Sequence, residues 1–453
     1  MKYRFIRVLG VVVALAGCLN MRAAMASDDN ARHRILVSSD IGGTDPDDNQ
    51  SMIHLLMYAN EFDIEGLVSS PSFGEGSKEE ISRMVAMYAR DLPKLECGLK
   101  SEHGDSRGAY PSPEYLASIT KQGRKGAAPL CGYGESTEGS DWIVKCARKE
   151  DSRPLWVLVW GALEDVAQAL HDAPDIADKI RVYWIGGPNK KWGCNAYSYI
   201  ARNFPSLWFI ENNASYRGFI GRSSDGSMYQ GGFWKTFMKD AGVMGNDFIN
   251  YYGGNVKMGD TPSLLYLMSG DADTPDSDHW GGKFEPMSSS SCYAVTGQLC
   301  AADTVPCYSL MEWRLEGPVV DVAADSVCFT LTVDKQQWAG YHIGDGVYMV
   351  RYAPKAPAVL PYVIASEIEG FPVHEGCFTV GEKWNSENQY GFSSGNLVPM
   401  SIDLSVVNES GNKTTSWWTD VQDYTTSWQG SATISKWRQD IMEDWSKRFK
   451  WLK

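Results

Sequence analysis

The chain has 453 residues and a formal net charge of −14 at pH 7. This length exceeds that of one average domain, so we expect one large domain together with a smaller module. The acidic balance argues against a nucleic-acid backbone or an anionic membrane surface as a partner, and we expect no nucleic-acid binding.

The first 26 residues have the pattern of a signal peptide. The chain begins with basic residues, and residues 8–17 are apolar but too few to span a bilayer. Two cleavage sites compete. Residues 15–18 resemble a bacterial lipoprotein box that would place a lipid on Cys18, whereas residues 24–26 suit an ordinary signal peptidase that releases a chain starting at Ser27. The position of Cys18 favours the lipoprotein. Both sites predict export to the periplasm, the outer membrane or the medium, with a membrane contact only through that lipid.

Export permits disulfide bonds. Nine cysteines remain when Cys18 is set aside, so at least one is unpaired or pairs between chains. The plausible pairs are Cys328 with Cys377 and Cys131 with Cys146.

Four aspartates crowd the point where the first predicted strand gives way to a helix. They are Asp40, Asp45, Asp47 and Asp48. An apolar run at residues 35–37 indicates a buried strand, and a helical pattern starts after the last aspartate. In an open α/β sheet this junction lies at the carboxyl edge, where such folds bind ligands. One or two aspartates could cap the helix, but four repel unless a proton or a hard cation such as Ca²⁺ intervenes.

This loop resembles the N-terminal signature of the inosine-uridine preferring nucleoside hydrolases. It resembles more closely their secreted, nucleoside-hydrolase-like branch, often labelled cellulose-binding. The main family has Asp-x-Asp-Pro-Gly-x-Asp-Asp, whereas here Ser38 replaces the first Asp and six residues, not three, separate Asp40 from Asp47. The resemblance implies an α/β protein with an open, mostly parallel, Rossmann-like nucleoside hydrolase fold. It also implies a Ca²⁺ site that includes Asp40 and Asp48, with Asp45 as an alternative ligand.

The next elements continue an alternation of strands and helices. Residues 64–70 predict a strand and residues 79–90 a helix, and residues 92–139 are interpreted as loops over the sheet edge. Residues 155–163 form a continuous apolar strand that ends at a glycine, followed by an amphipathic helix. The resemblance implies that the backbone carbonyl of Trp160, at the end of this strand, binds the calcium.

Two further strands are predicted, at residues 180–187 and 207–213. Asn195 lies in a loop between them. At the end of the second strand, Glu211 and Asn213 match the Glu-x-Asn with which the family holds ribose hydroxyls, a task that suits a carboxylate and an amide. A capped polar strand end is the alternative explanation. The resemblance assigns sugar binding to Asp47, Asn195, Glu211 and Asn213.

Asp260 starts a predicted helix and has Pro262 close behind it, so helix capping is its simplest explanation. The resemblance implies instead that Asp260 closes the calcium site. The family often carries a His before this Asp to act on the leaving base, but here that residue is Gly259. His279 is the candidate proton donor that could replace it, with a surface histidine as the alternative.

The pattern of residues changes at residue 287. Residues 287–415 contain short β-rich runs separated by turns, which predict an inserted small β-sandwich-like module. Residues 416–453 return to the style of the first domain and end in a helix with apolar residues every four positions, suited to packing on the sheet. The resemblance covers residues 32–286 and 416–453. We therefore expect a signal peptide at 1–26, an α/β domain at 32–286 completed by 416–453, and the inserted module at 287–415.

Together these features predict an exported, calcium-dependent N-glycosidase that hydrolyses a nucleoside or another ribosyl compound. Asp40, Asp48, Asp260 and the Trp160 carbonyl would hold Ca²⁺, and Asp40 would take the proton of the attacking water. The alternative is a catalytically altered carbohydrate-binding protein on the same fold, whose module or tryptophans engage a polysaccharide. Relatives of this kind are often dimers or tetramers, so a homo-oligomer is a further expectation.

Overall fold

The computed structural model describes residues 32–104, 108–220, 228, 230–381, 395–423 and 428–453. The predicted signal peptide, including Cys18, lies outside the described residues. Within the described part of the chain, no helix combines the length and apolarity needed to cross a membrane.

The larger of the two main units is built on an eight-stranded sheet with the order β3-β2-β1-β4-β5-β6-β19-β7. All neighbouring strands in it run parallel except the final pair, β19 and β7. The strand order reverses between β1 and β4, and open α/β sheets bind ligands outside the carboxyl ends of strands at such a point. The strands are β1 (His33–Ser39), β2 (Phe62–Ser69), β3 (Thr120–Gln122), β4 (Leu155–Val159), β5 (Ile180–Ile185), β6 (Trp208–Asn212), β7 (Phe284–Pro286) and β19 (Trp417–Asp420).

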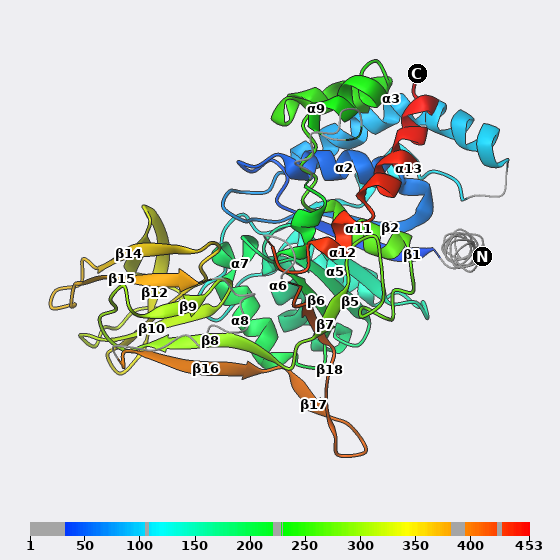
Figure 1. Ribbon diagram of the computed structural model, residues 1–453. Coiled ribbons are helices and arrows are strands. Elements are labelled where there is room, and N and C mark those ends of the chain that lie inside the picture. The colour runs from blue at the N-terminus through cyan, green and yellow to red at the C-terminus, as the bar shows by residue number, and fades with distance from the viewer. Residues whose placement is uncertain (1–31, 105–107, 221–227, 229, 382–394, 424–427) are drawn as a thin grey trace, which may run out of the picture.

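Helices cover both faces of this sheet (Figure 1). Alternate residues of β1 enter two different cores, as the two-residue period of a strand requires: Ile35 and Val37 lie in one core and Leu36 lies in the other. The helices of the first core are α2 (Asp47–Met57), α3 (Lys78–His103), α11 (Thr261–Met268) and α13 (Arg438–Trp451). Those of the second are α5 (Glu138–Ala147), α6 (Glu164–Asp172) and α8 (Cys194–Asn203). Shorter helices are α4 (Pro113–Ser118), α7 (Asn189–Trp192), α9 (Gln230–Phe233), α10 (Gly242–Asp247) and α12 (Ala432–Ser435).

The interpretation of residues 92–139 as loops is wrong for much of that segment. Helix α3 continues through Pro93 to His103, and α4 and β3 follow. Proline disfavours a helix interior, but Leu95 and Leu99 are buried and belong to the first core. Tertiary packing therefore overrides the local signal.

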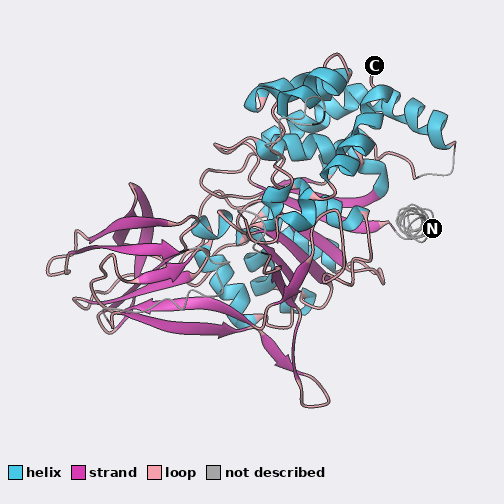
Figure 2. Ribbon diagram, viewed as in Figure 1, coloured by secondary structure: helices cyan, strands magenta, loops and turns pink. Residues whose placement is uncertain are grey.

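The second unit is a nine-stranded sheet that curls around an aromatic core (Figure 2). Its order is β16-β8-β10-β13-β12-β11-β14-β15-β9. The chain leaves the first sheet after β7 and returns at β19, and these two strands pair with each other. The strands are β8 (Ser289–Val295), β9 (Thr304–Pro306), β10 (Leu310–Glu316), β11 (Val327–Val333), β12 (Gln336–Gly344), β13 (Val347–Tyr352), β14 (Ala358–Ala365), β15 (His374–Gly381) and β16 (Leu397–Asp403), with a separate hairpin of β17 (Ser405–Val407) and β18 (Lys413–Thr415).

Neither predicted disulfide forms, because all four cysteines are free thiols. Cys328 lies on β11 and Cys377 on β15, and β14 runs between them. Two strand spacings amount to roughly 10 Å, which exceeds the Cα separation of a disulfide. Cys146 is buried with its Sγ 3.4 Å from the Glu65 carbonyl, whereas Cys131 is exposed.

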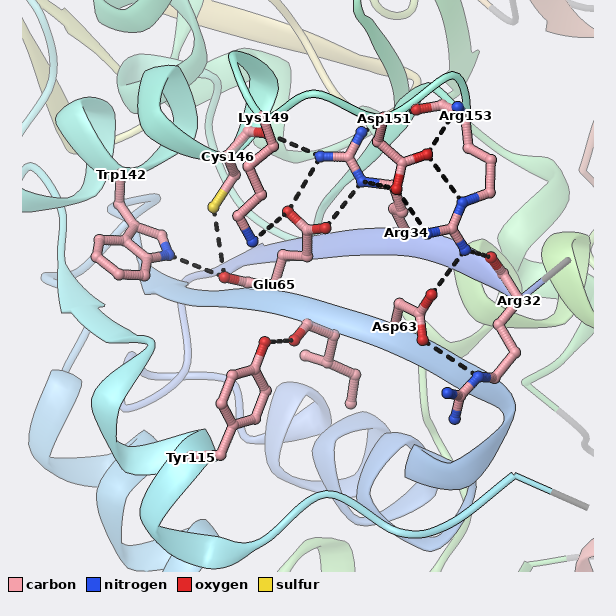
Figure 3. Close-up of polar contacts among 11 residues, drawn as sticks. Arg32, Arg34, Asp63, Glu65, Tyr115, Trp142, Cys146, Lys149, Asp151 and Arg153 are labelled. Carbon is pink, nitrogen blue, oxygen red and sulfur yellow. Dashed lines mark hydrogen bonds and ion pairs between the residues drawn. The ribbon is translucent and has the colours of Figure 1, made fainter. Parts of the chain in front are cut away.

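A buried ionic network fastens the amino ends of the central strands (Figure 3). The Arg34 guanidinium donates to both Glu65 carboxylate oxygens, at 2.8 and 3.2 Å, and to the backbone carbonyls of Arg153 and Cys146, at 2.8 Å each. Lys149 adds a second cation 2.9 Å from Glu65. This network lies at the edge of the sheet opposite to the carboxyl ends of the strands.

Candidate metal and sugar site

Three aspartates from two helices converge at the carboxyl edge of the first sheet. Asp47 and Asp48 form the first turn of α2, and Asp260 immediately precedes α11. One oxygen from each of the three carboxylates lies within 4.8 Å of the others. The fold thus brings together the loop after β1 and the start of α11, as the resemblance implies for Asp48 and Asp260. The third member of the group is Asp47, which the resemblance assigns to the sugar, and not Asp40.

Helix capping does not explain these carboxylates. The side chain of Asp260 makes no capping hydrogen bond to α11, and its buried Oδ2 has no hydrogen-bond partner among the described residues. Asp48 is 2% exposed and Asp260 is 4% exposed. Buried charges are normally paired or bound to metal ions, so this donor set fits a hard cation that prefers carboxylate oxygens.

The pKa values of the aspartates show that burial and mutual repulsion disfavour their charged forms. Burial raises the pKa of Asp40 to about 6 and that of Asp47 to about 7. Burial and the neighbouring carboxylates raise the pKa values of Asp48 and Asp260 well above the ordinary range. Like charges at close range cannot all ionise unless something compensates them. A divalent cation would replace the protons.

Asp48 is held in place by the end of β1. The Ser39 hydroxyl donates to Asp48 Oδ1 at 2.5 Å and accepts from the backbone N–H of Ile41 at 3.1 Å. After burial, the neighbouring Asp40 carboxylate is the main cause of the raised pKa of Asp48, and Asp40 is not among the three aspartates whose oxygens lie within 4.8 Å of one another. Asp40 therefore lies beside the three-aspartate group and not within its tightest set. The role of Ser39 was missed, because a serine at a strand end gives no distinctive signal.

The end of β4 lies against Asp40. The backbone N–H of Trp160 donates to the Ser38 carbonyl at 2.7 Å, and its indole Nε1 donates to Ser263 Oγ on α11 at 2.7 Å. A Cβ added to the next residue, Gly161, would lie 2.9 Å from the Asp40 Cβ. Trp160 thus links β4, β1 and α11 at the site. Its carbonyl remains a predicted ligand.

A lysine that the sequence did not single out borders the cluster. Lys257 Nζ pairs with Asp45 and lies 3.6 Å from Asp47 Oδ2. Its backbone N–H donates to Gln50 Oε1 at 2.8 Å, which ties this segment to α2. Asp45 is 56% exposed and is occupied by the lysine. It therefore lies outside the tight group, and a lone lysine in a Gly-rich stretch gives no pattern from which its place could be inferred.

Glu211 and Asn213 lie together at the end of β6. Asn213 Nδ2 donates to Glu211 Oε1 at 2.7 Å, and the Tyr197 hydroxyl donates to Glu211 Oε2 at 2.7 Å. Lys190 Nζ, which is also buried, forms an ion pair with the same carboxylate. The opposite atom of the amide, Asn213 Oδ1, is buried and has no hydrogen-bond partner among the described residues. Glu211 is therefore placed to orient the amide of Asn213, and Lys190 and Tyr197 are partners that the sequence did not reveal.

Tyr216 connects this pair to the acidic cluster. A Cβ added to Gly187 would lie 2.4 Å from the Asn213 carbonyl O and 3.2 Å from Tyr216 Cε1, and one added to Gly259 would lie 3.7 Å from Tyr216 Cδ2. Burial raises the pKa of Tyr216 to about 12. The tyrosine thus lies between the Asn213 side and the Asp47 side of one site.

The structure does not bring Asn195 to this site. The residue lies in the first turn of α8 and not in a loop. Its Nδ2 donates to the Ala128 carbonyl at 3.0 Å, and its Oδ1 accepts from Arg351 of β13 at 3.3 Å. The amide therefore joins α8 to an overlying loop and to the second sheet. The loop prediction failed because α8 already begins at Cys194.

His279 is also remote from the carboxylates. It is completely buried, with Nδ1 2.7 Å from the Ser269 carbonyl O and Nε2 3.1 Å from the Thr274 carbonyl O. Its ring stacks on Tyr266 near the C-terminal end of α11, whereas Asp260 precedes the N-terminal end. Eight helical residues separate these ends by about 12 Å. His279 is placed as a structural residue.

Comparisons with known proteins agree with this architecture. Residues 34–284 match the family model described as the cellulose-binding Sde182, nucleoside hydrolase-like domain. Residues 304–367, in the second sheet, match a domain of unknown function, DUF5060. No curated protein matches the chain.

Several solved structures are similar to the chain. A nucleoside hydrolase-related protein from Saccharophagus degradans, described as associated with carbohydrate metabolism, is 18% identical, with a TM-score of 0.46 over 78% of this chain and 100% of its own. An inosine-uridine preferring nucleoside hydrolase from Bacillus anthracis is 11% identical, with a TM-score of 0.36 over 77% of this chain and 95% of its own. The plant nucleoside hydrolase PpNRh1 is 9% identical, with a TM-score of 0.32 over 78% and 95%. Because the family model spans more than half of the sequence, the chain belongs to the family of cellulose-binding Sde182 proteins with a nucleoside hydrolase-like domain.

Proposed function

We propose that this protein is an exported, Ca²⁺-dependent N-glycosidase that hydrolyses a ribosyl compound. The observation that carries the proposal is the convergence of Asp47, Asp48 and Asp260, with one oxygen of each within 4.8 Å of the others. These carboxylates lie at the switch point of a parallel sheet, where this fold class binds its ligands. The family description, which is nucleoside hydrolase-like, supports the same reading.

Asp48, Asp260 and the Trp160 carbonyl would hold the cation, together with Asp40 or Asp47. Carboxylate and carbonyl oxygens are the ligands that Ca²⁺ prefers. When bound there, the cation would lower the pKa of the attacking water.

Asp40 is the group that we assign to take the proton of this water. Asp40 neighbours Asp48, and with the cation bound both carboxyl groups would be ionised, so that Asp40 could act as a general base on the water. The water oxygen bonds to the anomeric carbon as the bond to the leaving group breaks, and the sugar passes through an oxocarbenium-like state. The Oδ1 of Asn213, which has no partner among the described residues, would accept a hydrogen bond from a sugar hydroxyl. Glu211 orients this amide.

Among the described residues, the site provides no proton donor for the leaving group. Gly259 carries no side chain, and His279 lies near the far end of α11. We therefore propose substrates whose leaving group departs without a proton from the enzyme.

A second candidate is a carbohydrate-binding protein that keeps the pocket without hydrolysis. Gly259 and the distant His279 favour it, as does the cellulose-binding description of the family. In this case the cation would hold sugar hydroxyls and no bond would break.

Hydrolysis of p-nitrophenyl β-D-riboside distinguishes the two. Its leaving group needs no acid, so the missing histidine cannot mask a competent site. The chain from Ser27 is assayed with Ca²⁺ and then with chelator, beside a panel of nucleosides. Release that chelator abolishes supports the hydrolase, whereas no release from protein that binds Ca²⁺ supports the binding protein.

A further inference from the structure

The chain enters α11 through residues 251–258, a segment whose backbone is left-handed at four positions. These are Tyr252 (φ 50°), Gly253 (φ 63°), Gly254 (φ 78°) and Met258 (φ 40°). Glycine adopts such angles without steric cost, whereas Tyr252 and Met258 do not. A strained backbone persists only where the surrounding structure holds it, and such strain is concentrated at functional sites. Asp260 follows this segment, so its position depends on how the segment is held.

A buried side chain of α2 holds the segment. Gln50 is completely buried, and its Nε2 donates to the Asn255 carbonyl at 2.8 Å. Its Oε1 accepts from the backbone N–H of Lys257 at 2.8 Å and from that of Met258 at 3.1 Å. Both ends of the amide are thus bonded to one short stretch of backbone, which includes the strained Met258.

The same helix carries the other half of the acidic cluster. Asp47 and Gln50 are three residues apart on α2 and therefore lie on one face of it. Asp260 lies two residues beyond Met258, whose N–H Gln50 binds. Gln50 therefore links the helix that supplies Asp47 and Asp48 to the segment that leads to Asp260.

This link opposes the repulsion between the carboxylates. One oxygen from each of the three aspartates lies within 4.8 Å of the others, so in their charged forms they push α2 and the segment apart. Lys257 Nζ, which is 3.6 Å from Asp47 Oδ2, attracts in the opposite sense. The lysine side chain is 30% exposed, so solvent screens this attraction. The hydrogen bonds of Gln50 are buried and are not screened in this way.

We propose that Gln50 is a positioning residue, which holds Asp260 beside Asp47 and Asp48 before a cation binds. Because its amide is bonded to backbone at both ends, we do not assign it as a ligand. Its hydrogen bonds order the segment in the cation-free protein, so that the cation meets a preformed site and does not have to order the backbone as it binds. The inference rests on the cation site of the proposed function and adds the residue that sets the geometry of that site.

The first test replaces the amide with a side chain of similar size that makes none of these bonds. Gln50→Met should weaken Ca²⁺ binding about tenfold, the lower value for groups that only support metal ligands. The loss is partial because Val256 and Met258, which are buried, still anchor the segment. Calorimetric titration measures the affinity at a temperature at which circular dichroism shows the variant to be folded.

Gln168→Met is the matched control. Gln168 is also a buried glutamine, and its Oε1 accepts from the Gly134 N–H at 2.7 Å. It lies on α6, which packs in the second core, whereas α2 and α11 pack in the first. Both variants should lower the melting temperature in chelator, because each leaves a backbone N–H without its partner. Only Gln50→Met should lower Ca²⁺ affinity, which a purely structural role would leave unchanged.

The second test uses the wild type and so does not depend on the folding of a variant. Hydrogen exchange is followed by mass spectrometry on peptides that span residues 251–260, in chelator and then in Ca²⁺. In the wild type, the amides of Lys257 and Met258 should already be protected in chelator, and Ca²⁺ should slow their exchange little further. In Gln50→Met they should exchange faster in chelator and regain protection when Ca²⁺ is added.

Two outcomes would overturn the proposal. One is equal Ca²⁺ affinity in the wild type and Gln50→Met, and the other is a wild-type segment that shows no protection until Ca²⁺ is added. Wild-type protein that binds no Ca²⁺ would disprove the cation site and this inference together. Binding of Ca²⁺ without hydrolysis of p-nitrophenyl β-D-riboside would disprove the proposed reaction and leave the role of Gln50 standing.

Discussion

The Asp47 carboxylate occupies the space that a side chain on residue 259 would need. A Cβ added to Gly259 would lie 2.5 Å from Asp47 Oδ2, closer than real Cβ contacts come. A side chain at position 259 would therefore have to displace the Asp47 carboxylate.

Gly259→Ala should displace Asp47 and weaken Ca²⁺ binding, and Gly259→His should weaken it further without adding activity on nucleosides. Calorimetry and a nucleoside assay measure the two effects. A Gly259→His variant with wild-type Ca²⁺ affinity and faster nucleoside hydrolysis would show that the site admits the missing acid.

Asp48→Asn should reduce Ca²⁺ affinity at least about a hundredfold, since even groups that only hydrogen-bond to metal ligands contribute about 10–100-fold at metal sites. Asp45→Asn is the matched control. Asp45 is 56% exposed and pairs with Lys257, and loss of such a surface pair should change affinity by less than about threefold. Calorimetric titration of both variants checks this, and equal losses would contradict the assignment.

The acidic cluster also predicts how stability depends on pH. The folded pKa of Asp47 is about 7, above the ordinary 3.8. Its protonated form is favoured by folding, so its contribution to stability is fully present below pH 3.8 and is lost as the pH rises through about 7.

In chelator, the wild-type melting temperature should therefore fall more between about pH 5 and about pH 8 than that of Asp47→Asn. Added Ca²⁺ should stabilise the wild type most at the upper pH, where the carboxylates are charged. Thermal melts across this range test both statements. Identical pH profiles for the two proteins would show that Asp47 does not carry the effect.

Arg34→Ala should lower the free energy of unfolding by about 3–5 kcal/mol, because it leaves Glu65 buried with fewer partners. Ca²⁺ affinity should not change, because Arg34 lies near the start of β1, whereas Asp47 and Asp48 follow its end. Lys125→Ala, from an exposed pair with Glu75, should cost less than about 0.5 kcal/mol. Denaturant unfolding measures the loss of stability in both variants. A lower Ca²⁺ affinity in Arg34→Ala would contradict the expectation that the network does not affect the metal site.

His279→Gln should reduce stability by about 2 kcal/mol, since the backbone carbonyl that accepts from the N–H of the buried ring would lose this partner. The rate on p-nitrophenyl β-D-riboside and its pH profile should not change in the folded variant. A selective loss of turnover on nucleosides, with p-nitrophenyl riboside unaffected, would instead identify His279 as the leaving-group acid.

The sequence predicted those parts of the site that follow strand ends. Asp47 and Asp48 follow β1 at its junction with α2, and parallel topology sends such junctions to one edge. Glu211 and Asn213 were recognisable for the same reason, because they end and follow β6. Asp260 follows no strand, and only the resemblance predicted its place.

The predictions that failed concern residues whose positions depend on contacts with distant parts of the chain. Asn195 accepts a hydrogen bond from Arg351, which is 156 residues later in the chain. Lys190 and Lys257 carry no periodic signal, since their places are set by the carboxylates that they meet after folding. The pair of Cys328 and Cys377 failed because β14 lies between β11 and β15 in the second sheet. The pair of Cys131 and Cys146 failed because Cys146 is buried on α5 and Cys131 is exposed.

Anomalous diffraction from crystals soaked in Ca²⁺, or in Mn²⁺ as its surrogate, would locate the cation. We expect one peak about 2.3–2.6 Å from carboxylate oxygens of Asp48 and Asp260, with Asp47 or Asp40 beside it. A protein that shows no peak there, or a peak only at the exposed Asp45, would contradict a metal-dependent reaction at this site.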